Sequence, residues 1–322
     1  MPIAILGSRR SILGRGEPMS KNTENVNGSQ VSMEDLKQFK GRSMAQETVH
    51  RLLKNKGAVV GMIFLVCLVI IAIISDFVFE YDTQIIGLNP TAIYAKPSLA
   101  HPFGCDNMGR DILARIMYGA RYSLTIGIGS VMIGLFIGLI LGSLAGFYGG
   151  FIDNLVMRAN DILYSIPNIM IAVVVVSIFG TSPASLLLSL CVTAASAFAR
   201  ISRAAVMQVR GQEFIESAYA MGLPTWKVIL RHIIPNCLSP IIVQVTLAVG
   251  NNIIAASSLS FLGVGIPVPI PEWGAMLSDG RTYIRSAPWM CVFPGLAIMI
   301  TVLALNLMGD GLRDALDPKL KK

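Results

Sequence analysis

The chain has 322 residues, of which 53% are hydrophobic and only 14% are charged. Soluble globular domains carry about 25% charged residues, so this composition excludes an intrinsically disordered chain and argues against an ordinary soluble domain. The net charge is +7 and the mean hydropathy is +0.64. The five cysteines lie far apart without a C-x-x-C pair, and the three histidines are scattered, so we predict no disulfide framework, metal site or cofactor site.

The polar N-terminal segment 1–56 is predicted to be a cytoplasmic tail. No apolar stretch in it is followed by a small-residue cleavage site, so it is unlike a signal peptide. Met19 is an alternative start, which would make residues 1–18 an extension. The mild basic character of the tail favours contact with anionic membrane lipid, and we expect no nucleic-acid binding.

Stretches without Asp, Glu, Lys or Arg locate the membrane spans, because a spanning helix needs about 20 apolar residues. Five stretches are long enough: 57–75, 122–152, 162–199, 232–271 and 286–309. The third would be about 57 Å long as one helix, and the turn signal at 180–183 divides it into spans at 163–180 and 183–199. Glycines and prolines beyond residue 262 confine the fourth to 238–258.

The sequence therefore predicts an all-α polytopic membrane protein with six transmembrane helices. The first helix is expected at 57–78, and the other five form a core within 123–308. Segments 1–56, 148–162, 200–237 and 309–322 hold 20 of the 26 Lys and Arg residues, whereas segments 79–122, 180–183 and 259–288 hold six. Because basic loops stay in the cytoplasm, we expect both termini and loop 200–237 to be cytoplasmic. Segment 79–122, with an amphipathic helix, and loop 259–288 are then outside.

The stretches that locate the predicted spans contain no Asp, Glu, Lys or Arg, and Asp76 lies directly after the first of them. Proton- and ion-driven carriers usually keep such residues at mid-membrane, and a membrane hydrolase would need a catalytic pair or a metal set. A P-loop of the form G-x-x-x-x-G-K-[ST] is also missing. We therefore predict no catalytic residues and favour a pore-forming subunit that another protein powers.

The second span carries four glycines at a four-residue spacing: Gly134, Gly138, Gly142 and Gly146. Such a small-residue face lets two helix backbones approach closely. Tight helix packing is the prediction, and a gating hinge is the alternative.

Loop 200–237 is predicted to hold two short helices. Residues 213–221 favour a helix with Glu213 and Glu216 in its first turn, ended by Gly222 at the C′ position. Thr225 is placed to cap a second helix, whose apolar stripe is Trp226, Ile229, Leu230, Ile233 and Ile234. The small side chains of Ser217, Ala218 and Ala220 would let a partner's groove close around the first helix, with Tyr219 and Met221 as anchors. The alternative is a helix pair that lies on lipid.

Glu216-Ser217-Ala218, followed by Gly222 and by Ile234-Pro235, resembles the EAA loop of ABC-importer permeases, with Ser217 in place of the usual Ala. In that family the loop is the coupling helix that docks on an ATPase subunit. The resemblance implies an ATPase-coupling site, made of Glu216, Ser217, Ala218, Tyr219, Met221, Gly222 and Pro235.

Three further stretches resemble the second permease subunit of the dipeptide/oligopeptide/nickel family: 101–111 with 119–124, 161–167, and 258–318. The resemblance implies a type I ABC-importer permease (MetI-like) fold in a bacterial or archaeal cytoplasmic membrane. It also implies a sister permease subunit, two ATPase subunits that bind ATP and Mg, and an extracytoplasmic binding protein that delivers peptide cargo. Glutathione-like compounds and nickel chelates are alternative cargoes. A self-contained carrier or channel and a scaffold without cargo are rival classes.

The outer loop is the candidate for the outer gate and the binding-protein contact, through Pro267, Pro269, Pro271, Glu272, Trp273 and Arg281. A rigid cap over the bundle is the alternative for these residues. Arg110 and Asp111 are interpreted as a surface salt pair or helix cap in preference to cargo ligands.

Overall fold

The computed structural model of the chain describes residues 44–316, and the predictions for 1–43 and 317–322 lie outside these residues. The described part is helical apart from an isolated bridge between Cys105 and Asp111. The elements are α2 (Met44–Lys54), α3 (Lys56–Val78), η1 (Tyr81–Ile85), η2 (Pro90–Ala92), α4 (Ile112–Tyr148), α5 (Gly150–Ser165), α6 (Asn168–Phe179), α7 (Pro183–Arg210), α8 (Glu213–Ala220), α9 (Thr225–Val228), η3 (Ile229–Ile233), α10 (Ile234–Phe261), α11 (Trp273–Arg281) and α12 (Trp289–Leu316).

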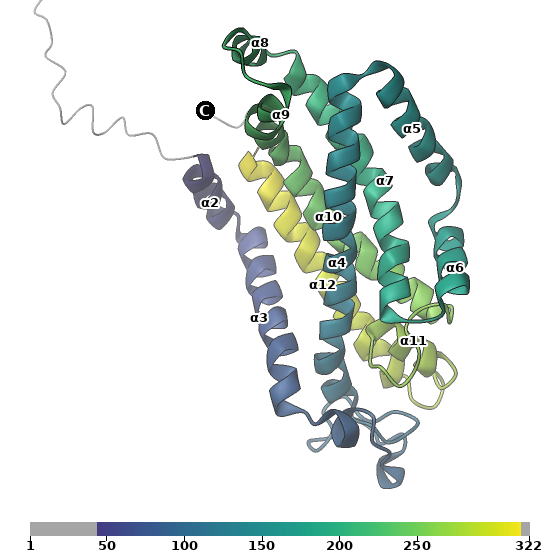
Figure 1. Cartoon of the computed structure of the whole chain (residues 1–322). Coiled ribbons are helices and arrows are strands. Elements are labelled where there is room, and N and C mark those ends of the chain that lie inside the picture. Colours follow the sequence, from purple (N-terminus) through teal and green to yellow (C-terminus); the bar gives the residue numbers. More distant parts are fainter. Residues whose placement is uncertain (1–43, 317–322) are drawn as a thin grey trace, which may run out of the picture. The chain divides into compact units, whose positions relative to one another are not determined.

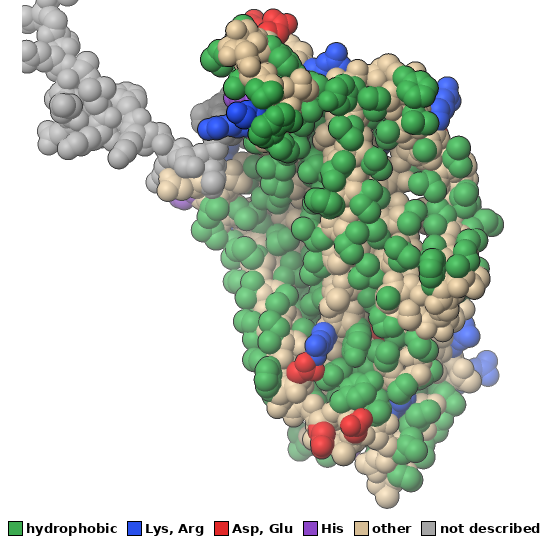
Figure 2. Space-filling model, viewed as in Figure 1, with side chains coloured by type: hydrophobic (Ala, Val, Ile, Leu, Met, Phe, Trp, Pro, Cys, Tyr) green, Lys and Arg blue, Asp and Glu red, His purple; other side chains and the backbone are tan. Residues whose placement is uncertain are grey.

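The long helices form a bundle whose two ends differ (Figure 1). One end carries α8, α9, α2 and the last turns of α12, and we call it the α8 end. The other carries α11 and the irregular segment 79–111, and we call it the α11 end. Hydrophobic side chains cover most of the visible flank between the ends, and charged side chains gather towards the ends (Figure 2). This distribution is that of a protein whose flank faces a bilayer.

By length and composition, five helical stretches among residues 44–316 can cross a membrane: α3, α4, α7, the continuous stretch Thr225–Phe261 and α12. The pair α5 and α6 makes a sixth crossing if it is counted as one. The predicted all-α architecture is confirmed, with six spans when α5 and α6 are counted together as one crossing.

The predicted span 163–180 is not a single helix. The helix α5 ends at Ser165, α6 begins at Asn168, and the two are bent by 90°. Pro167 is the physical reason, because proline disfavours the helical conformation in the preceding residue. Ile166 accordingly has an extended backbone, with φ of −93° and ψ of 127°. At 12 residues, α6 is about 18 Å long, too short to cross a hydrocarbon core of about 30 Å alone.

Helix α4 begins ten residues before the predicted second span. Asp111 caps it, since its carboxylate accepts a hydrogen bond from the backbone N–H of Ala114 at 3.0 Å. The amphipathic helix predicted within 79–122 is therefore the start of α4 and not a separate element. The longer α4 also brings Arg121 into a spanning helix, against prediction. Arg121 pairs with Asp76 of α3, so the two charges neutralise each other.

The most extensive helix contact of the bundle joins α4 to α7, and the four glycines of α4 lie in it. A Cβ atom added at Gly142 would lie 2.2 Å from the carbonyl oxygen of Ala199, and one at Gly138 would lie 2.6 Å from that of Ala195. Real Cβ atoms do not approach so closely, so the two helix backbones require glycine here.

Candidate functional site

Helix α8 is the first element of the predicted coupling loop, and both of its ends are stabilised by local interactions. Glu213 and Glu216 lie in its first turn, where negative charge stabilises the helix dipole. Gly222 has a φ of +77°, which an L side chain rarely adopts. Its N–H donates to the carbonyl of Tyr219 at 2.8 Å, and that of Leu223 donates to the carbonyl of Ala218 at 3.3 Å. This is a Schellman ending with glycine at C′, as the sequence predicts.

Helix α8 is held to the bundle by a small apolar cluster at the α8 end. Ile215 and Ala218 of α8 are 1% exposed, and they pack in one cluster with Val206 of α7 and with Val228 and Ile233. Ala218 is thus inside the molecule, so the structure corrects its assignment to a surface that a partner could touch. Its small side chain lets α8 lie close against the bundle.

The other predicted coupling residues are on the surface. Glu216, Ser217 and Tyr219 are exposed, and Met221 is 72% exposed. The Ser217 hydroxyl donates to the carbonyl of Glu213 at 3.0 Å. Pro235 is exposed in the first turn of α10.

Two apolar side chains that we predicted to lie in the stripe of the second helix are exposed instead. Trp226 is 60% exposed and Leu230 is 59% exposed. Pro224, and not Thr225, occupies the cap position of α9. The π-helical turn η3 explains the shifted face, because it places Ile233, five residues after Val228, back on the buried side.

We call α8, α9 and η3 together the hairpin. Its exposed surface combines large apolar side chains with charges of both signs. Its apolar members are Phe214, Tyr219, Met221, Trp226 and Leu230, its acids are Glu213 and Glu216, and its bases are Lys227 and Arg231. Contiguous exposed apolar side chains rimmed by charge are typical of a protein–protein contact. We call this set the hairpin surface.

The predicted outer-gate residues divide into buried and exposed members. Pro271, Glu272 and Trp273 are buried, whereas Pro267, Pro269 and Arg281 are exposed. Glu272 caps α11 by accepting from the N–H of Ala275 at 2.9 Å, and the Trp273 indole N–H donates to the carbonyl of Ile116 at 3.0 Å. Because these three residues are buried, the structure corrects their assignment to direct contact with a binding protein; the role of the exposed residues stays a prediction.

Arg110 is likewise not the surface residue that we predicted. It is 3% exposed and its guanidinium donates to Asp106 at 2.6 Å, so the residue is buried at the α11 end. Asp111 is the helix cap of α4, and its other oxygen lies 2.8 Å from Nδ1 of His101.

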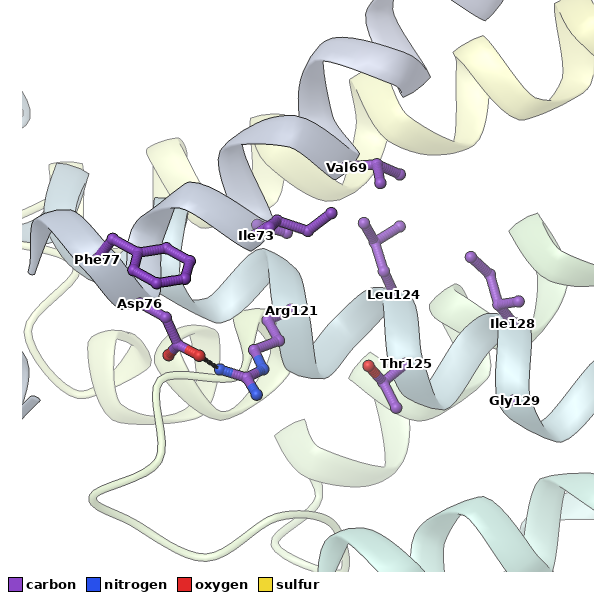
Figure 3. A pocket seen from close by; sticks show the side chains of 10 residues that line it. Val69, Ile73, Asp76, Phe77, Arg121, Leu124, Thr125, Ile128 and Gly129 are labelled. Carbon is purple, nitrogen blue, oxygen red and sulfur yellow. Dashed lines mark hydrogen bonds and ion pairs between the residues drawn. The ribbon is translucent and has the colours of Figure 1, made fainter.

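A groove of about 500 Å³ lies between α3 and α4 on the flank of the bundle (Figure 3). Val69, Ile73 and Leu124 line it, and the Asp76–Arg121 ion pair lies at its end towards α11. An apolar wall with one neutralised ion pair near the end of the span is the surface that membrane helices present to lipid chains.

This architecture, a bundle of apolar helices long enough to cross a membrane with a short amphipathic hairpin at one end, is that of a multi-pass membrane protein. Residues 134–322 match the family described as binding-protein-dependent transport system inner membrane component, and residues 43–97 match the N-terminal transmembrane domain of oligopeptide transport permease C. The chain belongs to this family of ABC-importer permease subunits.

Several curated proteins are similar over nearly their whole length. The dipeptide transport system permease protein DppC of Escherichia coli K12 is 44% identical over 309 residues, which cover 94% of this chain and 100% of that protein. DppC of Alkalihalophilus pseudofirmus is 44% identical, with 88% of this chain and 93% of that protein covered. The glutathione transport system permease protein GsiD of Pectobacterium atrosepticum is 43% identical, with 87% and 93% covered.

Among solved structures, an inward-facing conformation of the MetNI methionine ABC transporter has a similar fold. The TM-score is 0.54 at 20% sequence identity, and the match covers 64% of this chain and 98% of that chain. The predicted type I ABC-importer permease fold is thereby confirmed.

Proposed function

We propose that this chain imports peptides as one half of the transmembrane pathway of an ATP-driven transporter. The observation that carries the cargo assignment is its 44% identity with a dipeptide permease over the full length of that protein. Glutathione is the second candidate, because a glutathione permease is 43% identical. Nickel chelates are a third possible cargo in the same family.

The assembly in this proposal contains a homologous sister permease, two ATPase subunits and an extracytoplasmic binding protein. The hairpin surface docks on one ATPase, with Met221 and Trp226 as its most exposed apolar side chains. When ATP closes the ATPase pair, the movement passes through α8 to the apolar cluster that ties it to α7 and α10. Rigid transmission of this kind needs a close-packed contact, which the buried Ile215 and Ala218 supply.

Catalysis and cofactor binding lie outside this chain in the proposal. The ATPase subunits bind ATP and Mg and hydrolyse ATP, while this subunit has no catalytic role. We place it in the cytoplasmic membrane of a bacterium or archaeon with both termini and the α8 end in the cytoplasm. The basic bias of 20 residues to six across the predicted loops supports that orientation.

Deletion and complementation test the proposed function. A strain without this subunit should lose uptake of radiolabelled dipeptide, and the plasmid-borne chain should restore it. Glutathione and nickel uptake, measured in parallel, identify either alternative cargo. Unchanged dipeptide uptake in the deletion strain would contradict peptide import. Purification in mild detergent followed by mass spectrometry should recover the sister permease and the ATPases, and recovery of the chain alone would contradict the proposed assembly.

A further inference from the structure

A polar cleft of about 260 Å³ lies between the α5–α6 bend, α7 and α10. Its lining includes six uncharged polar side chains: Asn168, Thr193, Ser196, Gln244, Asn251 and Asn252. No charged residue lines it. The groove between α3 and α4, in contrast, has mainly apolar walls and contains the Asp76–Arg121 ion pair.

The cleft lies at the middle depth of the bundle. Ser196 is the fourteenth of the 28 residues of α7, and Gln244 and Asn251 are the eleventh and eighteenth of the 28 residues of α10. At 1.5 Å per residue, these positions are about 15–25 Å from the helix ends. Polar groups at this depth, beside a broken helix, are tolerated where they line a cavity and not where they face lipid.

Part of the hydrogen-bonding capacity of the cleft is unused. The Ser196 side chain is 5% exposed, and its hydroxyl has no partner among the described residues. Asn252 donates to the Ser130 hydroxyl at 2.8 Å, which fixes its amide and leaves its carbonyl oxygen without a described partner. A buried polar group without a partner costs about 1–3 kcal/mol. Of the buried side-chain atoms without a partner among the described residues, Ser196 Oγ alone belongs to a residue that lines the cleft, where a ligand can form the missing bond.

The chemistry of the lining selects the class of ligand. Side-chain amides and hydroxyls both donate and accept hydrogen bonds, and so do the N–H and C=O groups of a peptide main chain. A transition-metal ion favours thiolate, imidazole or carboxylate ligands, none of which lines the cleft, and a lipid chain would leave the amides unpaired. The polar part of the lining thus complements an uncharged main chain, and the remaining lining is mainly apolar: Leu163, Ile171, Ala194, Ala197, Phe198 and Ala248.

We propose that this cleft binds the main chain of the peptide in transit, with Ser196, Gln244 and Asn251 as hydrogen-bonding groups. This inference rests on the proposed peptide function and specifies the site for it. The Tyr164 ring forms one edge of the cleft, and the guanidinium of Arg200 lies 4.3 Å from the centre of that ring. Arg200 also pairs with Asp161 at 3.3 Å, so the edge is held in place without net charge in the cleft.

Two serines of α7 provide a matched test. Ser196→Ala removes the hydroxyl in the cleft, and Ser202→Ala removes another buried hydroxyl without a described partner, which lies against Gly142 of α4. Both variants are complemented into the deletion strain, and initial uptake is measured at limiting concentrations of several dipeptides with different side chains. Ser196→Ala should lower uptake of every dipeptide by about two- to tenfold, the range for one lost hydrogen bond, and Ser202→Ala should not.

A second pair covers the amides. Asn251→Leu should lower uptake at least as much as Ser196→Ala. The control is Asn306→Leu, because Asn306 of α12 lies near Gly250 and does not line the cleft. This control should lower uptake less than Asn251→Leu. Recovery of the sister permease and the melting temperature of the purified complex are measured for all four variants. If the Ser196 hydroxyl does not bind cargo, its removal should leave transport unchanged and the melting temperature equal or higher.

Wild-type uptake by Ser196→Ala and Asn251→Leu would overturn the inference. Loss of the sister permease on purification would also overturn it, because the cleft would then be a subunit contact. A fall restricted to dipeptides of one side-chain type would contradict main-chain recognition. Failure of the proposed function looks different, since the wild-type chain would then fail to restore dipeptide uptake.

Discussion

The carboxylate of Asp106 accepts a hydrogen bond from Nε of Arg110 at 2.6 Å, and both side chains are buried at the α11 end. The other carboxylate oxygen accepts from the backbone N–H groups of Met108 at 2.8 Å and Arg110 at 2.9 Å. Arg115 lies 3.8 Å from the same carboxylate. The buried carboxylate of Asp106 therefore fixes the backbone of the loop before α4 and offsets the positive charges of Arg110 and Arg115.

Asp106→Asn should destabilise the protein strongly, by about 3–5 kcal/mol, because it leaves a buried arginine without its counter-charge. Thermal unfolding in detergent measures the effect. The double variant Asp106→Asn with Arg110→Met removes both charges and should regain much of the loss. Equal stability of the single variant and the wild type would show that the pair contributes nothing.

Gly142→Ala tests the α4–α7 contact. The new methyl group would lie 2.2 Å from the Ala199 carbonyl oxygen, so the helices must separate, at a cost of about 1–3 kcal/mol. Gly211 is the control, since it has nothing within 4 Å and a φ of −85°, which alanine also adopts. Gly211→Ala should leave the melting temperature equal or higher. A transport defect in Gly142→Ala without any loss of stability would favour the gating hinge over packing.

Met221→Asp tests the hairpin surface. A charge at this 72% exposed apolar position should reduce recovery of the ATPase subunits on purification and lower peptide uptake severalfold, while membrane levels stay normal. Leu99→Asp is the matched control, because Leu99 is fully exposed in the segment 79–111 at the other end of the bundle. Equal ATPase recovery from the two variants would remove the docking role from the hairpin surface.

Glu216→Lys and Gly222→Trp test the same hairpin through its helix and its turn, and both should uncouple ATP hydrolysis from uptake without loss of membrane insertion. Gly222 has open space around it, so its substitution acts through the strained φ of +77° and not through a clash. Gly222→Asn is the conservative variant, since asparagine tolerates this backbone region, and it should retain more transport than Gly222→Ala. Wild-type uptake by Glu216→Lys and Gly222→Trp would refute the coupling assignment.

The reactivity of the Cys105 thiol tests the burial of the loop at the α11 end. Burial raises the pKa of its thiol to about 11, and Asp111 and Asp106 add to the effect. At pH 8 about one such thiol in a thousand is ionised, and the ionised fraction rises about tenfold per pH unit towards the pKa. Iodoacetamide labelling of Cys105, read by peptide mass spectrometry, should be slow in the native protein and fast after unfolding. Rapid native labelling at pH 7.5 would contradict its burial.

Local signals along the chain were sufficient for much of the fold. Apolar length predicted where α3, α4, α7, α10 and α12 lie, and Gly222 predicted the end of α8, because both depend on residues close in sequence. Apolar length did not predict the bend between α5 and α6. The apolar stripe of the second hairpin helix was harder to interpret. Its regular spacing could not reveal the π-helical turn that buries Val228 with Ile233 and exposes Trp226.

Other features depend on partners far away in sequence. Arg110 next to Asp111 suggested a surface pair, but its true partner Asp106 lies in a loop whose shape only the folded α11 end defines. The polar cleft brings together residues of α6, α7 and α10 that are up to 84 positions apart, from Asn168 to Asn252. Single asparagines, serines and threonines in apolar runs were its signal, and no spacing rule connects them.

The bend between α5 and α6 also determines how the subunit is turned about the membrane normal. The last carbonyl groups of α5 lack helical partners, and such a break is not tolerated against hydrocarbon. The α3 side, where Ile73 and Phe77 line the flank groove, carries no such requirement. We therefore expect a rotational preference within the bilayer, with the α5–α6 side towards protein or water and the α3 side towards lipid.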